Sequence, residues 1–397
     1  MIEKYRKEFN KNFSQAKYQA FLDDIAGEFN YSQPFRVAET PIFLPNEIKN
    51  QLLEACHEIL DVVYAPDFKG KTEGALEKAS IVPGEDEAPV FLAMDFGMCL
   101  DEKNKPIPQL IELQGFPTLN GFQYYLADKH RKHYNIPDSF STHPEKMSRE
   151  EYVDLLKKVI VGGEDPKQVV LLDIEPEKQA TKIDFLFTEK MLGIKILCLS
   201  DLKKRGKSLY YLNEDRKEIT VKRIYNRVIF DELYKREDLP REFHFTDEID
   251  AEWVGHPNWF YRASKYTLPY LNSKYVPESH YLSPEIEYPD DLQNYVLKPL
   301  YSFAGSGVEL NVTEKMLDGL EKKENYILQK KVSYARLIES NDDPAKFEIR
   351  MMTVYDKETK KVRITNNLVR LSKGEMIGVK YNKDKEWVGA SIAFFEG

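Results

Sequence analysis

The stretch that decides the fold is VFLAMDFGMCLDEKNKPIPQLIELQGF, residues 90–116, in which two apolar runs are joined by the polar segment DEKNK. Two such runs around a short polar segment predict a β-hairpin. In the first run, the two-residue period of a strand places Asp95 on the face opposite the apolar side chains. Those side chains belong to Leu92, Met94, Phe96 and Met98.

The second run shows the same separation of polar and apolar residues. Ile111 and Leu113 are expected to share one face, and Glu112 and Gln114 the opposite face. A turn centred between residues 103 and 104 then sets Asp95 directly opposite Glu112, provided that neither strand contains a bulge.

Two carboxylates at cross-strand distance repel each other unless positive charge lies between them. Mg²⁺ accepts oxygen ligands of this kind and leaves positions for phosphate oxygens and water. The side-chain carbonyl of Gln114 adds a further oxygen. The hairpin therefore predicts a Mg²⁺ site at Asp95, Glu112 and Gln114. The alternative is the solvated polar face of a two-sided hairpin, and the spacing alone favours that alternative.

Composition indicates a soluble globular protein of two or three domains. The 397 residues are 42% hydrophobic and 31% charged, and 57 basic against 66 acidic residues give a net charge of −9 with the signs intermixed. Nucleic acid is not an expected partner, because its affinity comes from a clustered basic face. The three cysteines form no CxxC or CxxH spacing, which favours a reducing, cytoplasmic compartment.

No membrane association is expected either. Apolar runs such as VVLLDI fall far short of the roughly 18 residues that span a bilayer. The first residues, MIEKYRKEFNKNF, mix acids and bases and lack the apolar core of a signal peptide.

Changes in local composition and hydrophobic periodicity along the chain predict three parts, residues 1–150, 151–260 and 261–397. The first part opens with helices, such as NEIKNQLLEACHEILDVV, then has loops over 65–88 and ends with the hairpin. The second part alternates helix, strand, helix and strand, which predicts a βαβ unit and a parallel sheet, completed by the strands SLYYLNED and KEITVKRIYNRV. The third part is rich in strands.

A candidate phosphate-binding loop lies in LKPLYSFAGSGVEL, residues 297–310. Lys298 ends an apolar strand and is followed by a loop that contains Gly305 and Gly307. Glycines allow backbone N–H groups to converge on an anion, and the lysine adds a positive charge. The loop has neither a Walker nor a Rossmann glycine pattern. Taken alone, a plain turn is the simpler interpretation.

Two further segments carry candidate nucleotide contacts. In ASKYTLPYL, Lys265 begins an amphipathic segment, and it could equally be a lysine on a helix surface. In NYILQKKV, the main chain at Gln329 and Lys330 leaves a strand where it could hydrogen-bond an adenine edge. The alternative for NYILQKKV is a lysine-rich edge strand.

Arginines on the last two long strands are candidates for recognising phosphate or carboxylate, which suits the planar guanidinium fork. FEIRMMTVYD places Glu348 and Arg350 on one face, and the next strand brings Asn367 and Arg370. A surface cross-strand ion pair is the alternative.

Taken together, these segments resemble the ATP-grasp ligases in the circularly permuted form of glutathionylspermidine synthetase-like proteins. The order of the segments carries the resemblance, because the carboxylate hairpin comes first and the lysine strands come last. The resemblance implies an α+β or α/β chain with a permuted ATP-grasp fold. It also implies a βαβ pre-ATP-grasp-like domain and a helical N-terminal segment.

The resemblance also assigns roles to residues. Asp95, Glu112 and Gln114 match the Mg²⁺ ligands, and Lys265 and Lys298 match the lysines that hold the ATP phosphates. The covering loop supplies Ser302, Gly305, Ser306 and Gly307, and the hinge strand supplies Gln329, Lys330 and Val332. Arg223 and Arg227 match a further family strand more loosely.

Two positions depart from the family pattern. Gln114 stands where asparagine is usual, which keeps the amide oxygen but lengthens the reach. Met94 stands where the synthetase has an arginine that touches phosphate. Arg350 or Arg370 is expected to supply that charge, as a catalytic residue.

The implied activity is that of an ATP- and Mg²⁺-dependent carboxylate–amine ligase, which forms an amide through an acyl phosphate and releases ADP and phosphate. Such chemistry needs positioning and charge neutralisation more than a nucleophilic side chain, and the sequence shows no Ser/His/Asp or Cys/His constellation. The expected substrates are a small-molecule or peptide carboxylate and an amine. A non-ligating ATP-binding regulatory protein and a small-molecule kinase are the alternatives, and the sequence leaves the oligomeric state open.

Overall fold

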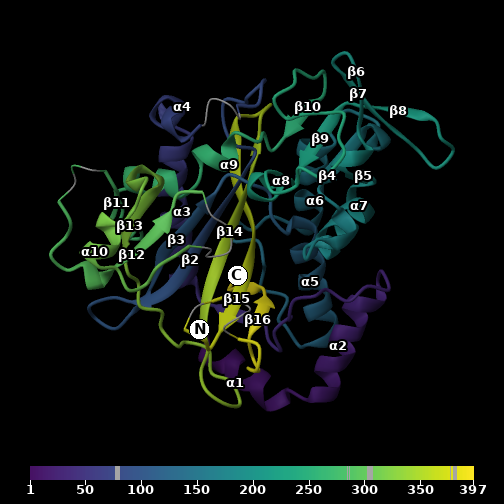
Figure 1. The fold of residues 1–397 in the computed structure, drawn as a ribbon. Coiled ribbons are helices and arrows are strands. Elements are labelled where there is room, and N and C mark those ends of the chain that lie inside the picture. The colour runs from purple at the N-terminus through teal and green to yellow at the C-terminus, as the bar shows by residue number, and fades with distance from the viewer. Residues whose placement is uncertain (77–80, 284, 286, 302–306, 376, 379–381) are drawn as a thin grey trace.

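The computed structural model describes residues 1–76, 81–283, 285, 287–301, 307–375, 377–378 and 382–397. A five-stranded sheet occupies the centre of the molecule, with a small three-stranded sheet on one side and a four-stranded parallel sheet on the other (Figure 1). The division into three parts at residues 150 and 260 stays a prediction.

The central sheet is antiparallel and joins distant parts of the sequence. Its strands run in the order β16-β15-β14-β2-β3, so the hairpin β2–β3 pairs through β2 with β14 from the C-terminal part. The strands are β2 (Phe91–Leu100), β3 (Pro106–Gln114), β14 (Lys346–Asp356), β15 (Lys361–Ser372) and β16 (Gly389–Ser391).

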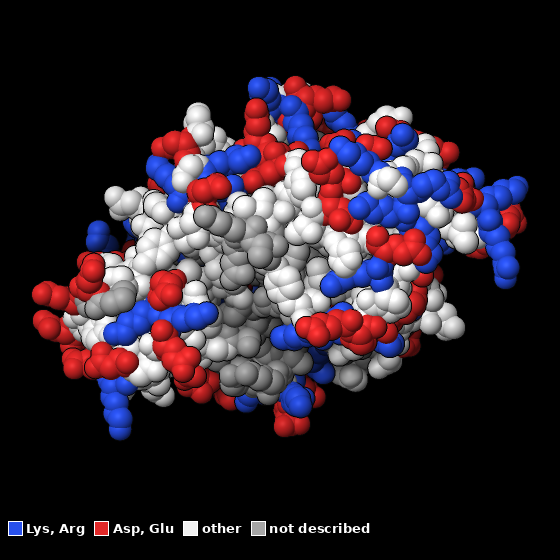
Figure 2. Space-filling model, turned by 45° about the horizontal axis from the view of Figure 1, so that its top comes forward, with Lys and Arg blue, Asp and Glu red and all other residues white. Residues whose placement is uncertain are grey.

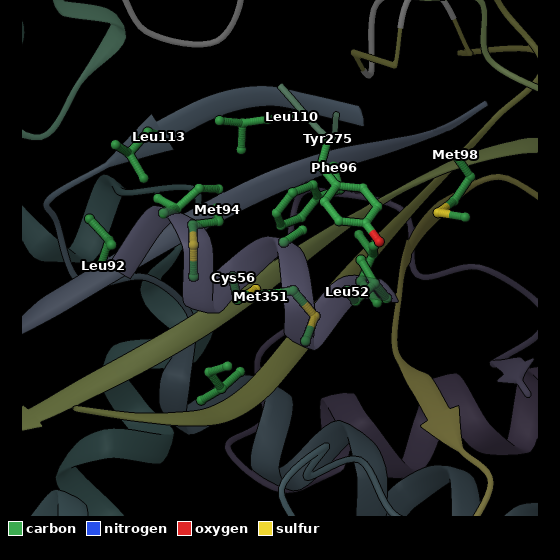
Figure 3. Packing of buried hydrophobic residues seen from close by; sticks show 14 of the residues in the cluster. Leu52, Cys56, Leu92, Met94, Phe96, Met98, Leu110, Leu113, Tyr275 and Met351 are labelled. Carbon is green, nitrogen blue, oxygen red and sulfur yellow. The ribbon is translucent and has the colours of Figure 1, made fainter. Parts of the chain in front are cut away.

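The apolar face of this sheet packs on helix α3 (Asn46–Val63), as the helical spacing in the sequence predicts. Figure 3 shows Leu52 and Cys56 of the helix together with Met94 and Phe96 of β2 in this core. The predicted face of β2 is confirmed, since Leu92, Met94, Phe96 and Met98 all belong to the same buried cluster.

The hairpin pairs Asp95 with Glu112 as predicted, but it contains a bulge. Phe96 pairs with Leu110 and Asp95 with Glu112, so Ile111 is an extra residue in β3. The turn is accordingly centred on residue 103 rather than between 103 and 104. The prediction that Ile111 shares the core face with Leu113 is wrong, because the bulge places Leu110 there instead.

The predicted βαβ unit is present as a parallel sheet of order β10-β9-β4-β5. Its strands are β4 (Val169–Asp173), β5 (Lys195–Cys198), β9 (Arg223–Asn226) and β10 (Glu252–Val254). The helix α7 (Lys182–Leu192) connects β4 to β5, and the neighbouring helices are α5 (Asn120–His133) and α6 (Arg149–Ile160).

The segment KEITVKRIYNRV forms two strands that belong to different sheets. β8 (Glu218–Val221) pairs with β7 (Ser208–Leu212), which in turn pairs with β6 (Lys203–Arg205). β9 follows after one residue and joins the parallel sheet. A short interruption thus sends the chain from a projecting antiparallel ribbon into the buried sheet (Figure 1).

The small sheet has the order β11-β13-β12 and packs with helix α10 (Glu314–Asp318) around its own apolar cluster. Its strands are β11 (Ser279–Tyr281), β12 (Tyr295–Pro299) and β13 (Tyr326–Lys330). Because β13 is the middle strand, the interpretation of NYILQKKV as an edge strand is wrong.

The remaining elements are the N-terminal helices, one further pair of strands and short helices. The helical opening is confirmed by α1 (Glu3–Asn12) and α2 (Gln15–Gly27), and β1 (Ile42–Leu44) pairs in parallel with β17 (Ala393–Phe395). A short helix, α4 (Phe68–Lys71), interrupts the predicted loop of 65–88. The other short helices are α8 (Phe230–Leu233) and α9 (Trp259–Arg262).

Surface charge and helix length add two observations. Basic and acidic side chains are intermixed on the face shown in Figure 2, as they are along the sequence. Over the described ranges, every helix is too short or too polar to cross a bilayer.

Candidate functional site

A small recess, with a cavity volume of about 20 Å³, opens where β3 ends against the segment that follows α9 and the end of β12. We refer to it as the recess, and its lining is Glu112, Leu113, Gln114, Gly115, Phe116, Phe260, Ala263, Ser264, Lys265, Leu300 and Tyr301. Three of the predicted site residues, Glu112, Gln114 and Lys265, therefore meet in one place.

Gly115 allows the two sides of the recess to come together. Its N–H donates to the Ala263 carbonyl at 2.6 Å, and a Cβ at this position would lie 2.3 Å from the Trp259 carbonyl oxygen. Only glycine fits so close to another backbone. This approach brings Lys265, at the start of a 3₁₀ helix, next to β3, and its Nζ lies 2.9 Å from Glu112 Oε1.

Glu112 carries a negative charge into the recess. Burial raises the pKa of its carboxyl group, but the charge of Lys265 outweighs this effect and leaves the pKa below its ordinary value. Glu112 Oε2 accepts a hydrogen bond from the Gln114 side-chain amide at 2.9 Å. With Lys265 on Oε1 and Gln114 on Oε2, both oxygens of Glu112 accept from a neighbouring side chain.

Lys298 is buried behind the recess and contacts the same strand. Its Nζ donates to the Ile111 carbonyl at 3.0 Å and to Gln329 Oε1. The Ile111 carbonyl belongs to the bulged residue, which regular ladder pairing does not use. Burial, and next the nearby charge of Lys265, lower the pKa of Lys298 to about 8.

Asp95 lies beside this group on the polar face of the central sheet, and two arginines bind it. Arg350 is its direct partner on β14 and donates from Nε at 2.5 Å and from Nη2 at 2.6 Å. Arg370 Nη2 donates to Asp95 Oδ2 at 2.7 Å and also to Glu348. The predicted arginines therefore reach the hairpin. The alternative of a cross-strand ion pair is confirmed for Glu348 and Arg370, which are direct partners, but the pair is not at the surface, because the Glu348 side chain is 5% exposed.

Asp95, Glu348, Arg350 and Arg370 form a charged cluster in which neighbouring charges shift the pKa values. Burial raises the pKa of Asp95, but the charges of Arg350 and Arg370 outweigh it and the pKa is lowered. Burial dominates at Glu348 and raises its pKa, and Tyr334 donates to its second oxygen at 3.0 Å. Burial lowers the pKa of Arg370, but the charges of Glu348 and Asp95 outweigh it and the pKa is raised.

The donor set fits Mg²⁺ at two of the three predicted positions. Glu112 and Gln114 line the recess and carry hard oxygen atoms of the kind this ion prefers, and the oxygens of Glu112 accept only from one lysine and one neutral amide. Asp95 is not part of the recess lining, and both of its oxygens accept from guanidinium groups. Among the described residues, no group of three or more His, Cys, Asp or Glu side chains is arranged as a metal site.

The hinge segment differs from its prediction. The N–H groups of Lys330 and Lys331 donate to the carbonyls of Glu278 and Asn294, so they are not open to an adenine edge. The Gln329 side chain turns to Lys298 instead, and its Nε2 has no hydrogen-bond partner within the described ranges. Val332 lies just past the end of β13.

Most of the predicted phosphate loop, including Ser302, Gly305 and Ser306, lies outside the described residues. Gly307 has a φ of +71°, a conformation that favours glycine. Two residues later, Glu309 pairs back onto Leu297 of β12.

The other arginines and Met94 lie elsewhere. Arg223 donates to the carbonyls of Val159 and Ile160, away from the recess. Arg227 forms a buried ion pair with Asp184 at 2.7 Å, and its guanidinium carbon lies 5.8 Å from the ring centroid of Phe116, which lines the recess. Met94 points into the core beneath the sheet, on the face away from Asp95.

Asn367 is not part of the site. Its side chain bonds the backbone of Thr142 and Ala393, which ties β15 to neighbouring segments.

Sequence reasoning missed three contributors. The first is Gly115, for which a glycine next to Gln114 was a usable signal of close packing. The second is the aromatic wall of Phe116, Phe260 and Tyr301, which no local pattern reveals because these residues come from three separate segments. Tyr334, which covers Gly97 and binds Glu348, gives no local signal at all.

Comparison with known proteins adds a statement about the fold. No family model matches the chain, and no curated protein matches it. A solved structure that is similar is a glutathione synthetase-like effector from Globodera pallida in its apo form, with a TM-score of 0.60 and 12% identity over 96% of each chain. The fold is thus mixed α/β and similar to that of a glutathione synthetase-like protein, and the circular permutation stays a prediction.

Proposed function

We propose that the chain is an ATP- and Mg²⁺-dependent carboxylate–amine ligase that forms an amide bond and releases ADP and phosphate. The observation that carries the proposal is the meeting of Glu112, Gln114 and Lys265 in one recess, with Lys298 bonded to the same strand behind it. Paired oxygen donors beside lysines suit a nucleotide polyphosphate and its cation. The glutathione synthetase-like fold supports the same class of reaction.

In the proposed reaction, an oxygen of the substrate carboxylate accepts the γ-phosphoryl group and ADP leaves. The amine nitrogen then attacks the carbonyl carbon, the C–N bond forms as the C–O bond to phosphate breaks, and the nitrogen loses a proton. Mg²⁺, held by Glu112 and Gln114, would supply positive charge to the phosphate oxygens. Electrostatic positioning of this kind needs no covalent intermediate on the protein.

The residues of the chain divide these tasks. Glu112 and Gln114 would hold the cation, and Lys265 and Lys298 would neutralise phosphate charge. Arg370, whose side chain is 38% exposed, is the guanidinium best able to meet the acyl phosphate, with Arg350 behind it. The aromatic wall of the recess would exclude water from the acyl phosphate. The free thiols of Cys56, Cys99 and Cys198 support a reducing, cytoplasmic setting for this reaction.

The test is a screen of carboxylate and amine pools for ADP release, with mass spectrometry to identify the amide. Lys265→Met removes the positive charge next to Glu112 and should abolish ADP release. A pool that yields amide with wild-type protein and none with Lys265→Met supports the proposal. A phosphorylated hydroxyl product without amide would instead identify a small-molecule kinase.

A second candidate is a non-ligating ATP-binding regulatory protein. The observation that favours it is that Asp95 already has its charge balanced by Arg350 and Arg370 of the same chain. The similar structure from Globodera pallida is described as an effector. This candidate predicts ATP binding in calorimetry with no ADP release from any pool.

A further inference from the structure

The carboxylate of Asp95 is almost fully used by other side chains. Oδ1 accepts from Arg350 Nε, and Oδ2 accepts from both Arg350 Nη2 and Arg370 Nη2, all within 2.7 Å. These bonds occupy three of the roughly four lone-pair positions of a carboxylate. The side chain is 1% exposed and is not part of the recess lining.

Its cross-strand neighbour Glu112 is in a different situation. Glu112 lines the recess and its side chain is 20% exposed. Its Oε1 pairs with the ammonium of Lys265, and its Oε2 accepts from the Gln114 amide. A cation in the recess can therefore bind Glu112 by displacing the Lys265 ammonium or the Gln114 amide, without separating a guanidinium from its carboxylate.

A metal bond to Asp95 would require Arg350 to move away. Arg350 is also nearly buried, and its other hydrogen bond is to the uncharged Thr118 hydroxyl at 3.0 Å. Loss of the carboxylate would leave a buried guanidinium without its direct partner, which is strongly unfavourable even with the charges of Glu112 and Glu348 nearby. The two residues are direct cross-strand partners, so the Arg350 side chain starts within reach of Asp95.

We propose that Asp95 is a positioning residue that orients Arg350 and Arg370 and forms no bond to the metal, which Glu112 and Gln114 hold. The inference rests on the proposed function, because it assigns roles within that same site. The bidentate pair fixes the plane of the Arg350 guanidinium. Asp95 and Glu348 both accept from Nη2 of Arg370 and together fix the orientation of its guanidinium.

The test uses Mn²⁺ in place of Mg²⁺ and a non-hydrolysable ATP analogue with the full chain. The electron paramagnetic resonance signal of free Mn²⁺ gives the metal affinity of wild type, Asp95→Asn and Glu112→Gln. We expect Glu112→Gln to weaken Mn²⁺ binding by about tenfold or more, which is about 1.4 kcal/mol or more. Asp95→Asn should leave the Mn²⁺ affinity unchanged within about twofold.

A second readout separates positioning from a merely structural role. Asp95→Asn should lower kcat for amide formation and leave KM for ATP near its wild-type value, because the arginines act on the acyl phosphate. The double variant Asp95→Asn with Arg350→Gln keeps the buried cluster neutral. It provides a folded reference if the single variant unfolds.

Selective loss of Mn²⁺ binding in folded Asp95→Asn, or in the double variant, would overturn the inference while leaving the proposed function intact. An unchanged kcat in Asp95→Asn would overturn the positioning role. If wild type with the analogue binds no Mn²⁺ at all, both the proposed function and this inference fail, and that result is distinct from a loss confined to the variants.

Discussion

Arg350 and Asp95 are direct cross-strand partners in the central sheet, and the guanidinium of Arg350 donates to both carboxylate oxygens of Asp95. Removing one member of such a buried pair leaves the other without compensation. Arg350→Ala is therefore expected to lower the free energy of unfolding by about 3–5 kcal/mol. Urea denaturation followed by circular dichroism measures the change.

A matched control lies on the neighbouring strand. Arg363 is 41% exposed and reaches Glu145 at 3.5 Å, so Arg363→Ala should change the stability by less than about 1 kcal/mol. Equal effects of the two substitutions would contradict the importance of the buried pair.

Lys298 predicts a pH dependence of stability. Its pKa in the folded chain is about 8, below the ordinary value of 10.5. Between these pH values the unfolded chain holds a proton that the folded chain has released, so stability rises with pH across this window. The free energy of unfolding of wild type relative to Lys298→Met should therefore increase from pH 8 towards pH 10.5.

Denaturation curves of both proteins at several pH values measure this difference. A difference that stays constant, or one that falls with rising pH, would show that the pKa of Lys298 is not lowered by folding.

The bulge at Ile111 makes a prediction about a deletion. Without Ile111, the pairs Phe96 with Leu110 and Asp95 with Glu112 become consecutive, and every side chain keeps its face. The deletion variant should fold, but Lys298 loses the carbonyl it binds. Loss of one such hydrogen bond should reduce stability by about 0.5–1.5 kcal/mol.

The contrasting deletion is that of Leu113, which moves Gln114 to the core face of β3. That variant should lose cooperative unfolding, whereas the Ile111 deletion should retain it. Similar denaturation behaviour of the two deletions would argue against the register described here.

Gly115 predicts a steric effect on the recess. In Gly115→Ala, the new methyl group would meet the Trp259 carbonyl oxygen at 2.3 Å, so the segment that carries Lys265 has to shift. Overpacking of this kind is expected to reduce stability by about 1–3 kcal/mol. ADP release should fall as well, because Lys265 moves away from Glu112.

The control is Gly27→Ala at the end of α2, where a Cβ would meet no atom within 4 Å. That substitution should leave both the unfolding curve and ADP release unchanged. A Gly115→Ala protein that matches this control would contradict the close packing at the end of β3.

Local periodicity was sufficient to predict the main helices and strands and the polar face of the hairpin. The alternation around Asp95 and the helix–strand alternation of 151–200 are properties of neighbouring residues, and both predictions are confirmed. The pairing of Asp95 with Glu112 was also correct, although two errors of register, the turn centre and the bulge, cancelled in it.

The bulge itself was beyond the reach of local sequence. It is stabilised by partners that lie far along the chain, because the Leu110 N–H donates to Tyr275 and the Ile111 carbonyl accepts from Lys298. The role of the arginines was hidden for the same reason. The strand FEIRMMTVYD shows a charged face, but only the sheet order reveals that this face lies against Asp95.

The order of strands in the central sheet has a consequence for synthesis of the chain on the ribosome. The hairpin that carries Asp95 and Glu112 emerges about 250 residues before the strand that carries Arg350, as the separation of the Arg350–Asp95 bond shows. Throughout that interval Asp95 lacks the guanidinium that balances its charge in the folded chain. We therefore expect the hairpin to remain disordered in nascent chains. It should become ordered only when β14 pairs with β2, late in translation.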